Sequence, residues 1–369
     1  MIREEINEIK KQFNKDTNVI TKYAGCYVDA EKNIKFITKD AFYSLPEEDA
    51  FKYEEIFRKT LSGAVGKSLL TLDFSIDEEG EDTPHAFLMK LRESRLDDEL
   101  ILDEFFRKVI DAYEYAENYY IILVDMMYDI PGKSSDKLAM EDASNEVYHG
   151  LLCSICPVTL SKPALSYFVN EGVIANRIRD WIVGMPMHGF LFPAFTDRTT
   201  DIHAALYFSK KNDALNESFI NEIIGVNPPM SSVMQKETFE AVLYDVLRDE
   251  LTMPVMSALS SNMLDLIAEN SQNPEPLVLT KNDMVKLISK SGVSDEAVES
   301  YEKSADADIE VLADNVVDTR KFEVKTPGIT VKTDTDSIEK LETRVIDGRK
   351  YLLVPIEDDV EVNGMPVKA

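Results

Sequence analysis

Four short apolar segments in the middle of the chain constrain its fold more than any other feature. They span residues 119–124, 151–158, 189–195 and 204–208. Each is rich in aromatic and β-branched residues and is bounded by Asp, Gly, Pro or Asn. This pattern is typical of a buried strand, and the segments are too short for a typical helix. We therefore expect them to lie at the centre of a sheet that extends over residues 19–209.

The remaining patterns predict helices and hairpins around this sheet. Residues 19–28 and 34–37 are expected to pair as a hairpin, and Pro46 is expected to begin a helix. Beyond Lys211 the apolar residues recur mainly at helical spacing. Near the end of the chain, the dipeptides at 347–348 (Asp-Gly) and 363–364 (Asn-Gly) are strong hairpin signals, because a type I′ turn needs two residues with positive φ.

These patterns predict an α+β protein with a mainly antiparallel central sheet flanked by helices. We expect three parts: an α+β core over residues 1–211, a helical segment over 212–315, and a small C-terminal β-hairpin subdomain over 316–369.

The charge of the chain restricts its partners. The 369 residues carry a formal net charge of −28, with 40 Lys and Arg against 68 Asp and Glu. Such a chain repels phosphate backbones and anionic lipids, so we expect neither a nucleic acid nor a membrane as partner. Only three cysteines are present, which indicates a reducing compartment. We expect a cytoplasmic protein whose partners are proteins, either another copy or a different chain.

Two Gly-Lys-Ser triplets resemble the end of a phosphate-binding loop. In residues 63–68 the glycine required five positions before the final glycine is replaced by Leu61, and in residues 132–134 by Met127. The first loop also follows a predicted helix and enters a predicted strand, whereas a phosphate-binding loop follows a strand and opens a helix. We therefore expect no nucleotide at either triplet, and no cofactor elsewhere.

Cys153 and Cys156 have the spacing of a redox pair or of half a zinc site. No second pair of Cys or His ligands follows, and residues three apart on a strand face opposite sides of a sheet. The four histidines are scattered and none forms a helical metal pair. We expect two buried core thiols and no metal.

Polar clusters between the apolar segments are the candidate site. A rigid sheet would present them, and their side chains could bind a small anion or transfer protons. The alternative is a hairpin loop in which Asp residues cap backbone amides and pair with Arg198, and we favour this structural interpretation. The candidate residues are Arg177, Arg179, Asp180, Asp197, Arg198, Asp201 and His203.

Three functional hypotheses remain open from the residues. The leading one is a non-catalytic binding or assembly protein, which requires an exposed apolar patch. The second is an enzyme acting on a small anionic ligand at the 197–203 loop, which requires the candidate residues to converge in a cleft. The third is a nucleic-acid or ribosome-associated protein, which requires Lys and Arg gathered on one face.

Six short stretches of the chain are distinctive when they are taken together. They are residues 5–13, 25–29, 56–63, 153–157, 190–195 and 343–349. Together they resemble a family of bacterial proteins, domain-of-unknown-function family 4317, found mostly in Gram-positive anaerobes. The resemblance covers nearly the whole chain and implies a bacterial cytosolic protein, but it implies no mechanism.

Overall fold

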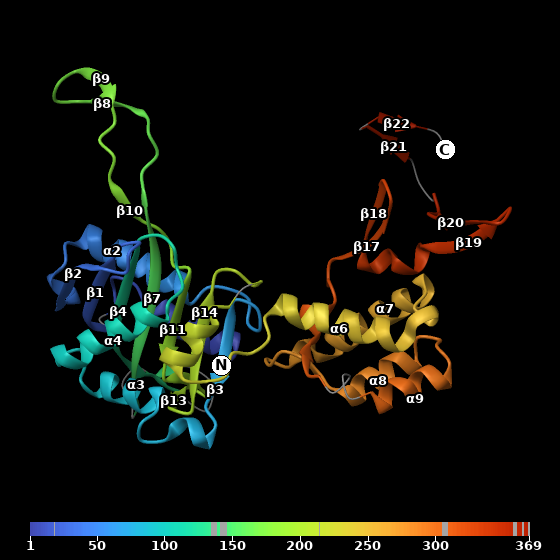
Figure 1. Ribbon diagram of the computed structural model, residues 1–369, viewed down its shortest axis with the longest axis horizontal. Helices are drawn as coiled ribbons and strands as arrows, with labels where there is room; N and C mark the ends of the chain where they lie inside the picture. Colours follow the sequence, from blue (N-terminus) through green and yellow to red (C-terminus); the bar gives the residue numbers. More distant parts are fainter. Residues whose placement is uncertain are drawn as a thin grey trace. The chain divides into compact units, whose positions relative to one another are not determined.

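The computed structural model describes the chain except residues 18, 134–138, 141–145, 214, 305–308, 357–359, 364 and 368–369. The chain forms two compact units, Met1–Ser231 (unit 1) and Ser232–Ala369 (unit 2) (Figure 1). Residues 212–231 therefore belong to the same unit as the central sheet.

An antiparallel sheet is the centre of unit 1, which confirms the predicted α+β class. Six neighbouring pairs of strands form its main path, and β10 (Trp181–Val183) pairs with the end of β7. In the order of the sheet, the strands are β2 (Ile34–Ala41), β1 (Ile20–Val28), β4 (Tyr119–Ile130), β7 (Glu146–Leu160), β11 (His188–Phe192), β14 (Ala204–Ser209) and β3 (Leu69–Asp73).

Helices cover both faces of this sheet, which explains why the central strands are apolar throughout rather than alternating. Along β4, Ile121 and Leu123 pack into one core, whereas Ile122 and Val124 pack into the core on the opposite face. On the first face lie α3 (Pro84–Glu93), α4 (Glu99–Ala112), α5 (Glu217–Phe219) and the π-helical turn η4 (Ile220–Ile224). On the second face lie α1 (Arg3–Lys11), α2 (Glu47–Thr60) and the 3₁₀ turn η1 (Phe42–Ser44).

Capping residues mark where two helices of the first face begin. Thr83 caps α3, because its hydroxyl accepts a hydrogen bond from the Ala86 amide, and Pro84 occupies the first turn. Asp98 caps α4 through the amides of Leu100 and Ile101. These caps fix where the two helices begin beside the sheet.

The segment 189–195, predicted as one strand, is divided. β11 ends at Phe192, and β12 (Ala194–Thr196) begins after Pro193 and pairs with β13 (Thr199–Asp201) instead of the large sheet. Proline has no N–H to donate to a strand ladder, which explains the break at Pro193. The chain therefore turns out of the sheet into a small hairpin.

Two further hairpins and one short turn complete the described part of unit 1. The hairpins are β5 (Gly132–Lys133) with β6 (Ala139–Met140), and β8 (Leu165–Phe168) with β9 (Val173–Asn176); the turn is η2 (Ile76–Glu79).

Unit 2 combines helices with hairpins, as its sequence predicts, and has its own apolar core. Asp347 and Gly348 both have positive φ, as a type I′ turn requires, whereas Gly364 of the predicted Asn-Gly turn lies outside the described residues. The helices are α6 (Ser232–Leu247), α7 (Met253–Glu269), α8 (Lys281–Ser289), α9 (Asp295–Lys303) and α10 (Ala313–Val316). The 3₁₀ turns are η5 (Arg248–Glu250), η6 (Asn270–Gln272) and η7 (Thr335–Lys340). The strand pairs are β15 (Val278–Leu279) with β16 (Val311–Leu312), β17 (Lys321–Thr326) with β18 (Ile329–Asp334), β19 (Glu342–Ile346) with β20 (Arg349–Leu353), and β21 (Val360–Val362) with β22 (Met365–Val367).

Candidate functional site

The seven candidate residues from the sequence fall into two groups at opposite ends of β7. Arg177, Arg179 and Asp180 lie between β9 and β10, and β10 pairs with residues 158–160 of β7. Asp197 and Arg198 form the turn between β12 and β13, and Figure 1 shows β9 and β13 at opposite ends of the sheet. The structure does not bring the two groups into one cleft.

Arg198 is held by an acidic residue of the first helix. Its Nε lies 3.0 Å and its Nη2 2.8 Å from carboxylate oxygens of Glu8, and Nη2 also donates to the Pro131 carbonyl at 3.1 Å. The Tyr128 hydroxyl donates to Glu8 at 3.0 Å. The structural interpretation of the sequence predicted that Arg198 pairs with Asp197, Asp201 or Asp180. This prediction is wrong, because the β12–β13 turn places the Arg198 guanidinium against Glu8 of α1.

The other residues of this turn make local contacts. The Asp197 amide donates to Glu5, and Asp201 accepts a hydrogen bond from the His203 amide at 3.1 Å. His203 Nδ1 lies 2.6 Å from a Glu79 oxygen, and this hydrogen bond raises the pKa of the imidazole. These contacts tie the turn to its surroundings, as the structural interpretation of the sequence expects.

Cys153 and Cys156 are buried on opposite faces of the sheet, as predicted, since Cys153 packs in the core beneath α4 and Cys156 in the core beneath α2. Burial raises the pKa of both thiols. The loop at residues 63–68 links α2 to β3, which confirms that its surroundings are not those of a phosphate-binding loop. Ser134 of the second triplet lies outside the described residues.

The sequence did not single out a buried polar cluster around Asp125 of β4. This carboxylate is fully buried, and it lies 2.6 Å from His149 Nε2 and 3.8 Å from Arg95 Nε, with a further hydrogen bond from the Thr21 hydroxyl. The cluster ties β1, β4 and β7 to the residues after α3. These partners satisfy the hydrogen-bonding capacity of the buried Asp125 carboxylate, and buried polar groups usually have such partners. We therefore assign the cluster a structural role.

A long two-stranded extension of β7 and β10 projects from unit 1. We call residues 161–185 the apolar arm (Figure 1). Backbone hydrogen bonds continue from the β7–β10 pair through Ser161 and Asp180 (2.9 Å) and through Ala164 and Arg177 (2.8 Å) into the β8–β9 hairpin. Gly172, with φ of 64°, closes the turn at the tip.

The apolar arm exposes a concentration of large apolar side chains. Tyr167 and Ile174 are directly paired across β8 and β9 and are 62% and 70% exposed, and Trp181 in β10 is 55% exposed. Ten such side chains lie within these 25 residues, against seven in the rest of the described part of unit 1. The ten are Leu165, Tyr167, Val169, Val173, Ile174, Ile178, Trp181, Ile182, Val183 and Met185.

Arg177, Arg179 and Asp180 support the base of the arm. Arg179 Nε donates to the Ser161 carbonyl at 2.6 Å, and the Asp180 amide donates to the Ser161 hydroxyl at 3.1 Å. The charged residues of this stretch led to the prediction of a polar cluster, so the arm was not predicted from the sequence. The signal that could have found it is the pair of short apolar runs on either side of Asn170, Glu171 and Gly172, which predict a hairpin.

The described residues contain neither a candidate metal site nor a helix that could span a membrane. Within the residues that the structure describes, no group of three or more His, Cys, Asp or Glu side chains could hold a metal ion. No helix in the described ranges is both long enough and apolar enough to cross a bilayer.

The fold and the arm define an α+β protein with a sheet covered on both faces and a projecting apolar hairpin. The chain belongs to the family described as Domain of unknown function (DUF4317), whose model matches residues 1–365. No curated protein matches the chain.

Proposed function

We propose that this protein is a non-catalytic assembly protein, in which two copies associate through their apolar arms. The observation that carries the proposal is the exposure of ten large apolar side chains on a projecting hairpin. Contiguous apolar surface of this kind marks protein-interaction sites in soluble proteins.

The stability of the arm itself supports a docking role. An isolated two-stranded hairpin is marginally stable in water, and it needs further strands or a packing partner to be independently stable. Tyr167 and Ile174 form one face of the β8–β9 hairpin and Phe168 and Val173 form the other, so both faces carry apolar side chains. A partner chain would bury these faces. Trp181 and Tyr167 are also residue types that dominate binding energy at interfaces.

A second copy of the chain fits this surface by charge and by symmetry. The arm carries Lys162, Arg177 and Arg179 against Glu171 and Asp180, a net charge of +1, whereas the whole chain carries −28. Two acidic chains can therefore approach through their arms with less repulsion than the net charge of the whole chain implies. Its mixture of both signs suits a two-fold contact, in which each residue meets its counterpart reciprocally.

The edge of the sheet supplies a second reason for self-association. Among the described strands, β10 pairs only with β7, so its outer edge offers backbone groups beside the apolar residues Trp181, Ile182 and Val183. Two such edges can pair antiparallel with each other.

The bonding of Arg198 to Glu8 also favours assembly over the small-anion alternative, since an anion would have to displace the Glu8 carboxylate from Arg198.

The single tryptophan of the chain, Trp181, lies in the arm and can report on its burial. We expect its emission to shift to shorter wavelength, and its quenching by acrylamide to fall, as the protein concentration rises. The double substitution Tyr167→Ser and Ile174→Ser (the arm variant) should abolish both changes while leaving Trp181 in place.

A matched control removes two apolar side chains elsewhere in unit 1 that are more exposed than those of the arm variant. Ile76→Ser with Leu100→Ser (the control variant) changes residues that are 92% and 83% exposed. This control variant should behave like the wild type. Emission that does not depend on concentration in the wild type, or a control variant that loses the effect equally, would refute arm-mediated assembly.

A further inference from the structure

A cavity separate from the arm opens between η1, the start of α2 and the segment after α1. Its volume is about 610 Å³, and pockets for small ligands occupy about 300–1,000 Å³. Apolar side chains form much of its wall, among them Ile20, Phe42, Leu45 and Phe51. A ligand that fills this space therefore needs an apolar body.

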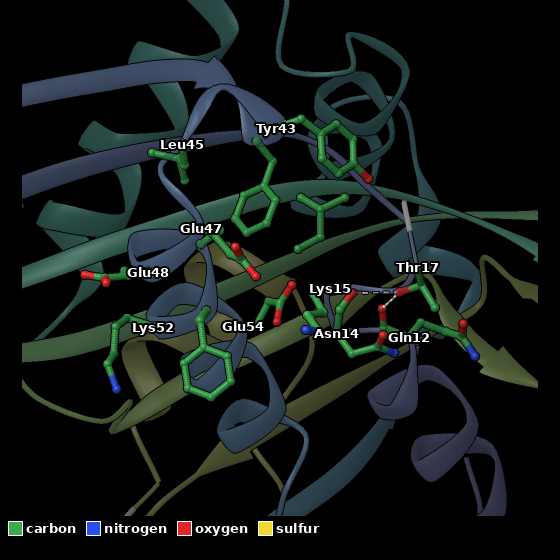
Figure 2. A pocket seen from close by; sticks show the side chains of 14 residues that line it. Gln12, Asn14, Lys15, Thr17, Tyr43, Leu45, Glu47, Glu48, Lys52 and Glu54 are labelled. Carbon is green, nitrogen blue, oxygen red and sulfur yellow. Dashed lines mark hydrogen bonds between the residues drawn. The ribbon is translucent and has the colours of Figure 1, made fainter.

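Carboxylates supply the charge of the cavity. Glu47 and Glu54 lie two helical turns apart on α2, and Figure 2 shows both among the lining side chains. Glu48 also lines the cavity, as do Lys15 and Lys52. The lining therefore holds three carboxylates and two ammonium groups, a formal net charge of −1, and Lys52 is bonded to Glu55 at 3.1 Å, outside the lining.

Glu54 is the most buried of these carboxylates. It is 5% exposed, and its ion-pair partner Arg58 lies 3.5 Å away. Arg58 also donates to the Phe13 carbonyl, so its charge is shared. Burial raises the pKa of Glu54, with Arg58 opposing this effect. A buried carboxylate of this kind gains from a second cation.

An aromatic ring in the same wall already attracts cations of the chain itself. The Lys52 ammonium lies 5.2 Å and the Arg58 guanidinium carbon 5.7 Å from the centroid of the Phe51 ring. Cations are attracted to aromatic faces at this range. The wall thus combines a ring that accepts cations with a buried carboxylate.

We infer that this cavity binds an organic cation, a primary ammonium or guanidinium group carried on an apolar body, with the cation at Glu54 and Glu47. The apolar body lies against Ile20, Phe42 and Phe51. This site is independent of the arm and of self-association.

Two probes with the same apolar body and opposite charge test the inference. We expect 4-phenylbutylamine, titrated by calorimetry into the full-length protein at pH 7.5, to bind at least about tenfold more tightly than 4-phenylbutanoate. Glu54→Gln should weaken the amine by about tenfold, since a hydrogen bond to a charged group is lost. Glu47→Gln, on the exposed first turn of α2, should weaken it to a smaller extent.

A matched control places the same substitution outside the cavity. Glu31→Gln, in the exposed turn between β1 and β2, should leave the affinity for the amine unchanged. Three results would each overturn the inference: no binding of the amine at millimolar concentration, equal binding of both probes, or amine binding that survives in both Glu54→Gln and Glu47→Gln.

Discussion

Arg198 and Glu8 join the β12–β13 turn to the first helix, and their side chains are 22% and 24% exposed. We expect Arg198→Ala to lower the free energy of unfolding by about 1–3 kcal/mol, between the ~0–1 kcal/mol of an exposed pair and the ~3–5 kcal/mol of a buried one. Urea denaturation measures the change.

The control for this substitution is Arg107→Ala, which removes an exposed pair with Asp103 on α4, with side chains 65% and 43% exposed. This substitution should lower the free energy of unfolding by much less than Arg198→Ala does, since an exposed ion pair contributes little to stability. Unchanged stability of Arg198→Ala, together with an anionic metabolite that protects only the wild type, would instead identify this turn as a ligand site.

His188, at the start of β11, gives the stability a pH dependence. Burial, helped by the Lys211 charge, lowers its pKa from 6.5 to about 4, and its Nδ1 lies 2.8 Å from the Tyr113 hydroxyl. The unfolded chain takes up this proton first as the pH falls, so stability is lost between pH 6.5 and 4. A pKa lowered by this amount corresponds to a loss of about 3 kcal/mol in the free energy of unfolding.

Urea denaturation at several pH values should show this loss in the wild type and a smaller one in His188→Gln. His203→Gln is a control of opposite sign, because Glu79 raises the pKa of His203 and so stabilises the fold at low pH. Parallel pH profiles of the wild type and His188→Gln would contradict the assignment.

Individual residues also show which structural features the sequence could predict and which it could not. Burial of Cys153 and Cys156 on opposite faces follows from their spacing on a strand, because side chains alternate along the chain. The partner of Arg198 does not follow, because Glu8 lies 190 positions away and its place depends on how α1 packs on the sheet. Local spacing therefore predicted the facing of residues and not the long-range ion pair.

Strand pairing between β7 and β11 depends on a close backbone approach at Gly189. A side-chain Cβ at this position would lie 2.3 Å from the Cys153 carbonyl oxygen and 2.7 Å from Thr60 Cγ2. We expect Gly189→Ala to destabilise unit 1 by at least about 1–3 kcal/mol, since backbone atoms must shift.

Gly80→Ala is the matched control, because a Cβ at position 80 would lie 3.4 Å from its nearest neighbour, Thr83 Cγ2, which is an ordinary van der Waals distance. Its effect should remain within about 0.5 kcal/mol in the same denaturation experiment. Equal stability of the two variants would show that β7 and β11 adjust more freely than their register indicates.

At the scale of elements, the central strands and most helices were predictable because their apolar periodicity and caps are local. β8, β9 and β10 were not predicted, because their apolar residues flank charged ones and the hairpin buries little of itself. The periodicity of apolar residues predicts the helices and strands that pack into a core. It is weak for an element that leaves its apolar faces exposed.

At the scale of the whole molecule, the net charge of −28 opposes the proposed association of two copies, whereas burial of the exposed apolar arms would favour it. Salt screens repulsion between exposed charges, with a Debye length of about 10 Å at 0.1 M and about 3 Å at 1 M. We therefore expect self-association to strengthen between 0.05 M and 0.5 M sodium chloride. Sedimentation equilibrium at both salt concentrations measures this, and weaker association at high salt would indicate that attraction between opposite charges drives the contact instead.

Sedimentation velocity across a range of protein concentrations tests the central claim most directly. We predict a reversible monomer–dimer equilibrium for the wild type and for the control variant (Ile76→Ser with Leu100→Ser). The arm variant (Tyr167→Ser with Ile174→Ser) should remain a monomer with unchanged stability to urea. A wild type that sediments as a monomer at every concentration, or an arm variant that dimerises like the wild type, would contradict assembly through the apolar arm.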